Sequence, residues 1–212
     1  MRIMLMYAIL PALPLLFFML IPAISRSGEP IQLFPGINAP WTSVNDSVMG
    51  GRSKGGAEIA ETGLLRFVGD ISLENRGGFS SIRSNSQDYG LPGNGTIVLR
   101  LRGANRGYFM DLRTSNRQGG FSYRAPFRPQ SDTEWAEIRI PLSTFRASAF
   151  GMDLPQSPPL RPDAVQSIGF TLYDTEAGPF TLEIERISFE ADEPPALPDF
   201  KDVEDPPSAI DP

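Results

Sequence analysis

The sequence predicts an all-β fold, an antiparallel β-sandwich. Glycine and proline supply 20 and 21 of the 212 residues, a share that suits many short strands joined by turns better than a helical bundle. Short runs rich in β-branched and aromatic residues alternate apolar and polar side chains, which is the period of a half-buried strand. The body shows no convincing amphipathic helix. A doubly wound α/β fold is therefore excluded, since it needs crossover helices.

The strand pattern recurs in around nine segments of the chain. In the segment 96–102, Ile97 and Leu99 lie on one face while Arg100 and Arg102 lie on the other. Turn residues separate most of these segments, as in a sandwich. The segments are 31–34, 63–68, 77–83, 96–102, 108–113, 121–125, 135–141, 167–173 and 180–189.

Three local breaks in the pattern carry their own predictions. Residues 69–70, Gly-Asp, are expected to turn the chain after the strand 63–68. A single helical turn is expected at 142–145, in a long connection that leads to Pro162. In the last strand the apolar parity changes between Ile184 and Ile187, which predicts a β-bulge.

Composition divides the chain into a leader, residues 1–25, a β-sandwich domain, residues 26–191, and an acidic, proline-rich tail, residues 192–212. The leader has a basic start and an uncharged apolar run, as in a secretory signal peptide, and the run is also long enough to span a bilayer. Its prolines shorten any spanning helix and favour cleavage. We expect the chain to be exported (periplasmic or extracellular) or anchored in a membrane by this segment. The tail is predicted to be disordered.

Charge and residue types limit the functions that the domain can have. The region 190–212 holds eight acidic residues against one lysine, so the rest of the chain is close to neutral despite the net charge of −6. Such a body does not indicate a nucleic-acid partner. With no histidine and no cysteine, the chain lacks the residues for Ser-His-Asp or Cys-His catalysis, for the usual zinc sites and for disulfides. We therefore predict no cofactor and no metal.

The stretch 41–56 is expected to be a shaped loop rather than a helix or a plain strand. It combines an aromatic anchor, an Asn-Asp pair and four glycines. Either it closes the first pair of strands, or it forms a ligand or partner site. Asp46 could hold Ca²⁺ with neighbouring carbonyl groups, or it could shape the turn; a single carboxylate supports the second reading better. The candidate site residues in this stretch are Trp41, Asn45, Asp46, Met49 and Ser53.

A second special loop follows at 74–78. Asn75 and Arg76 could line the polar rim of a binding surface, or the loop could be a hairpin turn whose glycines take positive φ. Arginines on the predicted strands could gather on one sheet and grip a carboxylate or stack on a sugar, or they could pair across strands with acidic residues such as Glu137, Asp111 and Glu183. The candidates from these strands are Arg83, Arg113, Tyr123 and Arg124.

The motifs of the two loops lie in one order along the chain and resemble those of a known family. The motifs are Trp41-x-x-Val44-Asn45-Asp46-x-Val48-Met49-Gly50-Gly51-x-Ser53 and the run from Gly69 to Arg83. They resemble the complex I intermediate-associated protein 30 family, and the resemblance extends over 31–191. It implies a galactose-binding-like jelly roll, similar to certain carbohydrate-binding modules. Mitochondrial members of that family help to assemble NADH:ubiquinone oxidoreductase as chaperones, but this chain begins with a signal or anchor in place of a transit peptide.

Two functions remain open from the sequence. The first is a non-catalytic assembly module that uses the two loops and a strand face to hold a protein partner. That partner could itself be associated with a membrane. The second is a carbohydrate-binding module. An enzyme is not expected, because the acidic pairs Glu134–Glu137 and Glu183–Glu185 would need a cleft around a substrate and have no aromatic platform in their own segments.

Overall fold

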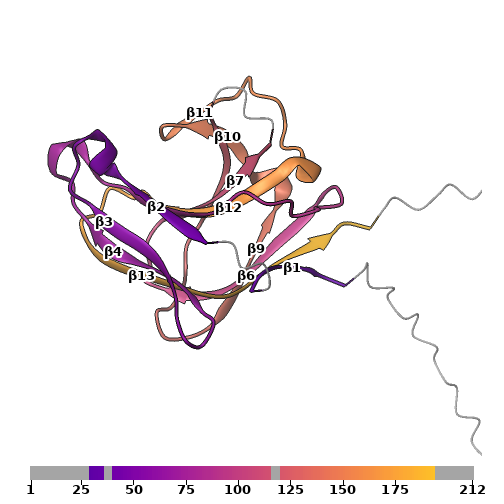
Figure 1. Cartoon of the computed structure of the whole chain (residues 1–212), viewed down its shortest axis with the longest axis horizontal. Coiled ribbons are helices and arrows are strands. Elements are labelled where there is room, and N and C mark those ends of the chain that lie inside the picture. The colour runs from indigo at the N-terminus through magenta and orange to yellow at the C-terminus, as the bar shows by residue number, and fades with distance from the viewer. Residues whose placement is uncertain (1–28, 36–39, 116–119, 194–212) are drawn as a thin grey trace, which may run out of the picture.

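The computed structural model describes residues 29–35, 40–115 and 120–193. In these residues two antiparallel β-sheets pack face to face as a jelly-roll sandwich (Figure 1), which confirms the predicted fold class. The leader, residues 1–25, lies outside the described residues, as does the tail beyond residue 193. Among the described residues, no helix is long and apolar enough to cross a membrane.

The first sheet, called sheet I, has the strand order β3-β4-β13-β6-β9, and β1 also pairs with β13. The long strand β13 is its centre and pairs with β4, β6 and β1. The strands are β1 (Ile31–Phe34), β3 (Lys54–Ile59), β4 (Leu65–Ile71), β6 (Gly95–Gly103), β9 (Ala136–Pro141) and β13 (Gly178–Ala191).

The second sheet, called sheet II, has the order β11-β10-β8-β7-β12-β5-β2. It is bent, and Figure 1 shows β10 and β11 turned up, away from sheet I, so that the outward side of sheet II is concave. The strands are β2 (Trp41–Asn45), β5 (Ser80–Ser84), β7 (Tyr108–Thr114), β8 (Ser122–Phe127), β10 (Arg146–Ala149), β11 (Met152–Asp153) and β12 (Val165–Leu172).

Within the described part of the chain, four short 3₁₀ helices connect the strands. The helical turn expected at 142–145 is present as η3. The helices are η1 (Asp46–Met49), η2 (Glu74–Arg76), η3 (Leu142–Thr144) and η4 (Pro162–Ala164).

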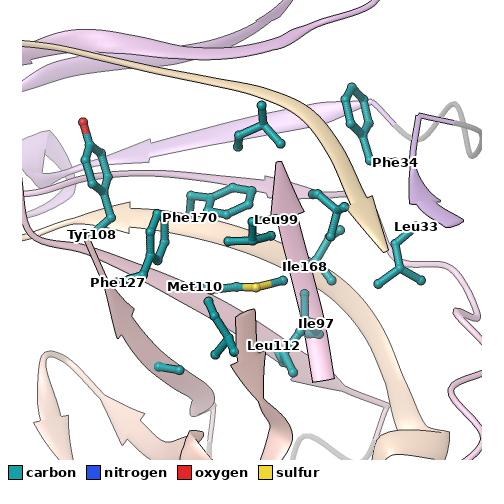
Figure 2. Packing of buried hydrophobic residues seen from close by; sticks show 14 of the residues in the cluster. Leu33, Phe34, Ile97, Leu99, Tyr108, Met110, Leu112, Phe127, Ile168 and Phe170 are labelled. Carbon is teal, nitrogen blue, oxygen red and sulfur yellow. The ribbon is translucent and has the colours of Figure 1, made fainter. Parts of the chain in front are cut away.

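The core between the sheets is built from the apolar positions that alternate along the strands. Figure 2 shows Leu99 of β6 facing Met110 of β7 and Phe170 of β12. Each of these side chains is fully buried. Burial of a side chain of this size contributes about 1.5–3 kcal/mol, so each of these residues stabilises the sandwich.

The predicted bulge in the last strand is confirmed. The pairing of β13 with β6 shifts register between Ile184 and Arg186. The shift returns Ile187 and Phe189 to the buried side, where both are fully covered. The extra residue of the bulge therefore accounts for the change in apolar parity that the sequence shows.

Two strands at the start of the domain were not expected. The stretch 41–56 was predicted to be a loop, but it contains β2 and the start of β3, with η1 between them. These strands carry little apolar alternation, and they exist because β2 pairs with β5 and β3 pairs with β4 along their whole lengths. Tertiary pairing overrides weak local propensity in both cases.

The turn expected at residues 69–70 is also wrong, since β4 continues through both. A Cβ atom at Gly69 would lie 2.1 Å from the carbonyl oxygen of Lys54 and 2.6 Å from the Cα of Gly55. The glycine therefore permits the close approach of β3 to β4 rather than a turn.

The segment 74–78 does not close a hairpin. It carries the chain from β4 in sheet I to β5 in sheet II. The left-handed backbone conformation is taken by Asn75 and Arg76, with φ of 55° and 59°, as well as by Gly78. The long connection expected up to Pro162 holds a further correction, the hairpin of β10 and β11.

Candidate functional site

Asp46 joins the two special loops of the sequence at one end of the sandwich. Its carboxylate is fully buried and accepts hydrogen bonds from the amide of Ser53 at 2.9 Å, from Ser53 Oγ at 2.5 Å and from the amide of Gly78 at 2.6 Å. The amide of Phe79 adds a longer bond of 3.4 Å. One side chain thus ties the connection from β2 to β3 to the connection from β4 to β5.

Further contacts hold the two connections together. Ser53 Oγ accepts a hydrogen bond from the amide of Ser72 at 3.0 Å, and Asn75 Nδ2 donates to the carbonyl oxygen of Gly50 at 3.0 Å. The exposed pair of Arg52 and Glu74 adds an ion pair of 3.3 Å, which contributes little in water. The loops form one rigid unit, called the Asp46 unit, that comprises residues 46–53 and 72–79.

Glycines let the backbone pack against the carboxylate. A Cβ atom at Gly51 would lie 2.4 Å from Asp46 Cγ, and one at Gly77 would lie 2.5 Å from Asp46 Oδ2. No larger residue fits at either position without displacing Asp46. Gly51 and Gly77, one from each motif, are therefore explained by the volume of one aspartate.

The hydrogen bonds also set the ionisation of Asp46. Burial by itself raises the pKa of this carboxyl, but the bonds from Ser53 Oγ and from the amides of Gly78, Ser53 and Phe79 outweigh it and hold the pKa below its usual value. The group is thus an anion at neutral pH. Its oxygens face N–H and O–H donors, where a Ca²⁺ site would present oxygen ligands. Among the described residues, no three acidic side chains gather to hold a metal.

The outward surface of the Asp46 unit carries three large apolar side chains among exposed polar and charged ones. Val48 is 71% exposed, Met49 is 63% exposed and Leu73 is 47% exposed. Val48 and Met49 lie on η1, and a Cβ atom at Gly78 would lie 3.2 Å from Leu73 Cδ2, which places Leu73 against the same unit. Arg76 is exposed beside them, at the end of η2.

Trp41 and Asn45 lie behind this surface and build the sandwich. The Trp41 ring stacks on Phe170 and meets Phe34 edge-on, with ring centroids 6.2 and 6.3 Å apart. Asn45 accepts a hydrogen bond from Ser80 Oγ at 2.6 Å and donates from Nδ2 to the Gly55 carbonyl at 3.0 Å. Of the candidates at 41–53, only Met49 presents most of its side chain to solvent.

The outer face of sheet II carries the other candidate residues. Alternation places Arg83, Arg113 and Arg124 on this face, opposite the buried positions of the same strands. Tyr123 has the other parity and is buried, with its hydroxyl donating to the carbonyl oxygen of Pro158 at 3.0 Å. It lines a pocket of about 530 Å³ with Leu142 and other residues beside β10. The structure thus brings the three arginines onto one face and separates Tyr123 from them.

Asp111 is the centre of the outer face. Its Oδ1 accepts hydrogen bonds from Arg124, at 3.1 and 3.2 Å, and from Ser122 Oγ at 3.2 Å. Its Oδ2 accepts from Thr171 Oγ1 at 2.6 Å. The Arg124 guanidinium also lies 4.9 Å from the centroid of the Phe109 ring, a cation–π contact.

The arginines on β4, β6, β9 and β13 belong to sheet I and form ion pairs there. Arg102 Nε lies 2.6 Å from Glu183, Arg100 pairs with Glu185, and Arg186 lies 2.8 Å from Glu137. The cross-strand interpretation of the sequence therefore holds for this sheet. These pairs occupy the carboxylates of Glu183, Glu185 and Glu137.

Two features of the site were not found from the sequence. The β10–β11 hairpin adds Arg146 and Ser148 to the outer face, and it carries Phe150, which is 94% exposed with φ of 51°. A Cβ atom at Gly151 would lie 3.5 Å from the ring of Tyr173, so the tip of the hairpin reaches the end of β12. The four-residue run 146–149 was hidden in a long connection, and only its Phe-Gly turn marked it.

A buried ion pair was also missed. Arg106 lies 2.7 and 2.8 Å from the two carboxylate oxygens of Asp174, and both side chains are nearly inaccessible. The Asp174 carboxylate also accepts from the amide of Gly107 at 3.2 Å. The pair ties the connection before β7 to the one after β12. The residues lie 68 positions apart, so no local pattern could reveal them.

The chain was compared with known protein families and with solved structures. The model of the family described as Complex I intermediate-associated protein 30 matches residues 36–184. A curated mouse (Mus musculus) protein, "Complex I intermediate-associated protein 30, mitochondrial", is 35% identical over 95 residues. This match spans 43% of the chain but only 29% of the mouse protein.

Solved structures with the same fold are carbohydrate-binding modules. A family 11 module of a cellulosomal cellulase of Clostridium thermocellum superposes with a TM-score of 0.57 at 20% identity, over 79% of this chain and 97% of the module. A family 30 module of another cellulosomal cellulase of the same organism gives 0.52 at 14% identity, over 78% and 99%. At these identities the likeness establishes the fold alone.

Proposed function

Because the chain belongs to the complex I intermediate-associated protein 30 family, we propose that it is a non-catalytic module that binds a protein partner during assembly of a larger complex. The family is one of assembly factors, and the match covers nearly the whole folded body. The missing histidine and cysteine support a binding role over a catalytic one.

The observation that carries this proposal is the exposure of three large apolar side chains on the Asp46 unit. The large apolar side chains are exposed to solvent; they are those of Val48, Met49 and Leu73. The unit that carries them is ordered by buried hydrogen bonds. A surface that is ordered before binding loses less conformational entropy when the partner docks. Methionine in addition adapts to the shape of a partner.

We place this activity outside the cytoplasm or at a membrane, as the leader of residues 1–25 suggests. The basic start and the uncharged apolar run support export or anchoring. N-terminal sequencing of the mature protein tests it: a chain that begins near residue 26 supports cleavage and export, and an intact leader in the membrane fraction supports anchoring. An intact leader on a protein found only in the soluble cytoplasmic fraction would contradict both.

Quantitative co-purification tests the partner. The full chain is cross-linked in cells, solubilised in detergent and isolated, and its cross-linked proteins are quantified by mass spectrometry. The triple variant Val48→Ser, Met49→Ser, Leu73→Ser is expected to lose a protein that the wild type retains. Ile59→Ser is the control, since Ile59 is also an exposed apolar residue but lies at the end of β3. Recovery of the wild-type chain alone in repeated experiments would overturn the proposal, as would equal losses in both variants.

A second candidate function is carbohydrate binding at the β10–β11 hairpin. Phe150 is almost fully exposed, and a Cβ atom at the adjacent Gly151 would lie 3.5 Å from the ring of Tyr173, itself exposed, so the two aromatic residues lie on neighbouring segments. Exposed aromatic faces can stack on sugar rings. A panel of neutral polysaccharides tests this: binding that is lost in Phe150→Ala supports it, and no binding at millimolar sugar removes it.

A further inference from the structure

A single row of charged residues crosses the outer face of sheet II. The pairing registers align Arg83 of β5 with Gly169 of β12, Gly169 with Asp111 of β7, Asp111 with Arg124 of β8, and Arg124 with Arg146 of β10. Neighbouring strands lie about 4.8 Å apart. The row therefore presents three arginines and one aspartate across five adjacent strands of the concave side shown in Figure 1.

The single carboxylate of the row already accepts hydrogen bonds from neighbouring side chains. Asp111 accepts hydrogen bonds from Arg124, Ser122 and Thr171, which occupy both of its oxygens. It makes no ion pair with Arg83, from which it is separated by the strand that holds Gly169. Asp111 thus neutralises Arg124 and nothing else in the row.

The two other arginines of the row lack an acidic partner within the described residues. Arg146 donates only to the carbonyl oxygens of Ser143 and Phe145, and the side chain of Arg83 makes no ion pair. Arg146 lies directly opposite Arg124, and like charges in register on one face of a sheet are unfavourable. An anion placed over the row would relieve this repulsion.

An unused hydroxyl lies beside the row. Ser148 is 2% exposed, pairs in register with Ser122 and stands two residues from Arg146, yet its Oγ has no hydrogen-bond partner among the described residues. A buried hydroxyl without a partner is costly, and native proteins seldom leave one so. It offers a donor to a ligand that lies over β8 and β10.

We infer that this row binds an acidic, extended segment of the protein partner, with Arg83 and Arg146 as its carboxylate-binding residues. The inference rests on the proposed function, for which it names the chemistry of the partner. Guanidinium groups bind carboxylates through paired N–H donors, and side chains spaced along an extended peptide match groups spaced across strands. A neutral sugar is the poorer occupant, because the Phe109 ring next to the row is already covered by Arg124.

Fluorescence anisotropy with the full chain tests the inference. The probe is a labelled 12-residue peptide that alternates Glu and Ser, and the reference is the same peptide with Lys in place of Glu. We expect the acidic peptide alone to bind, and to bind at least tenfold more weakly at 300 mM than at 50 mM NaCl. Arg83→Gln with Arg146→Gln is expected to weaken binding at least tenfold, and Arg83→Lys with Arg146→Lys by less.

The matched control is Arg100→Gln with Arg139→Gln, which removes the same charge from the outer face of sheet I. It is expected to keep wild-type affinity. Equal loss in this control would overturn the inference, because general charge would then explain the binding. Absence of acidic-peptide binding by the wild-type chain would overturn it too. So would wild-type affinity in the Arg83→Gln, Arg146→Gln variant, provided that its thermal unfolding matches that of the wild type.

The same assay tests two other possible ligands of the row, an acidic polysaccharide and the chain's own tail. Tighter binding of polygalacturonate than of the acidic peptide would overturn the choice of a polypeptide. Tighter peptide binding after amide substitution of the tail's acidic residues would show that the chain's own tail competes for the row, and would overturn the assignment to a partner. Those residues are Asp192, Glu193, Asp199, Asp202, Glu204, Asp205 and Asp211.

Failure of this inference is separable from failure of the proposed function. If the cross-linked partner is still recovered and still lost in the Val48, Met49 and Leu73 variant, while the acidic peptide does not bind, the assembly role stands and the row has no acidic ligand. If neither is observed, both fail.

Discussion

The carboxylate of Asp46 accepts a 2.6 Å hydrogen bond from the amide of Gly78, 32 residues further along the chain. The bond spans two connections that each pass from one sheet of the sandwich to the other. The same carboxylate accepts from Ser53, so removal of this one group frees donors on both connections. The position of the exposed Val48, Met49 and Leu73 therefore depends on a residue that no partner can touch.

Asp46→Asn is expected to lower the free energy of unfolding by about 2–4 kcal/mol, because the amide that replaces one oxygen turns a donor toward buried donors. The wild-type pKa of Asp46 is lowered by folding, so its contribution is fully present above the unfolded value of about 3.9 and is lost as the pH falls through the folded value. The difference between the two proteins should be constant from pH 6 to 8 and shrink below about pH 4. Urea unfolding across this range measures it, and a difference that grows toward low pH would contradict the assignment.

Gly77→Ala is expected to destabilise the chain by about 1–3 kcal/mol, through a Cβ atom only 2.5 Å from Asp46 Oδ2. Gly56→Ala is the control, since its Cβ atom would meet nothing nearer than Ser43 Oγ at 3.6 Å. The control should change stability by less than about 0.5 kcal/mol. Thermal unfolding of both variants measures the difference. Equal effects would show that close packing on Asp46 is not the reason for the glycine at position 77.

Arg106→Met is expected to cost about 3–5 kcal/mol at pH 7, because it leaves the nearly inaccessible carboxylate of Asp174 without its cation. In the wild type, burial raises the pKa of Asp174, but the bonds from Arg106 and from the amides of Gly107 and Glu176 hold it below its usual value. Without Arg106 the pKa should rise, and protonation at lower pH should recover part of the loss. Denaturant unfolding at pH 7 and pH 4.5 measures the recovery.

The exposed pair of Arg161 and Asp163 provides the comparison for the buried one. Both side chains are more than half exposed. Arg161→Met should leave stability close to that of the wild type, because water screens such pairs. A cost equal to that of Arg106→Met would mean that burial does not govern the strength of these pairs.

Trp41→Ala is expected to lower stability by about 3–4 kcal/mol, since it removes the ring that stacks on Phe170 and meets Phe34. Trp41→Phe keeps an aromatic ring at this position and should cost about 1 kcal/mol. Urea unfolding measures both. A Trp41→Ala variant as stable as the wild type would show that the ring does not anchor the first strand of sheet II to the core.

The sandwich itself was predictable because apolar and polar residues alternate along most of its strands, which shows in the sequence which side of each strand faces the core. The segment 96–102 became β6, with Leu99 inside and Arg100 outside, as alternation required. The parity change before Ile187 even located the bulge. By contrast β2 and β3, around the Asp46 loop, have no such alternation, and only their partners β5 and β4 make them strands.

The candidate site divides in the same way. Turn chemistry marked Asp46, Asn75 and their glycines as special, but it could not show that both loops close on one carboxylate. Alternation placed Arg83 and Arg124 on outward faces, but the alignment of Arg83, Asp111, Arg124 and Arg146 depends on the order of the strands in sheet II.

The sequence by itself determined the fold class, the family and which side of most strands faces the core, because a period of two is a property of neighbouring residues. Only the tertiary structure decided which arginines share a face and what Asp46 holds, because these contacts join residues that are far apart in the chain. Their geometry is set by how the strands pair and how the two sheets are connected.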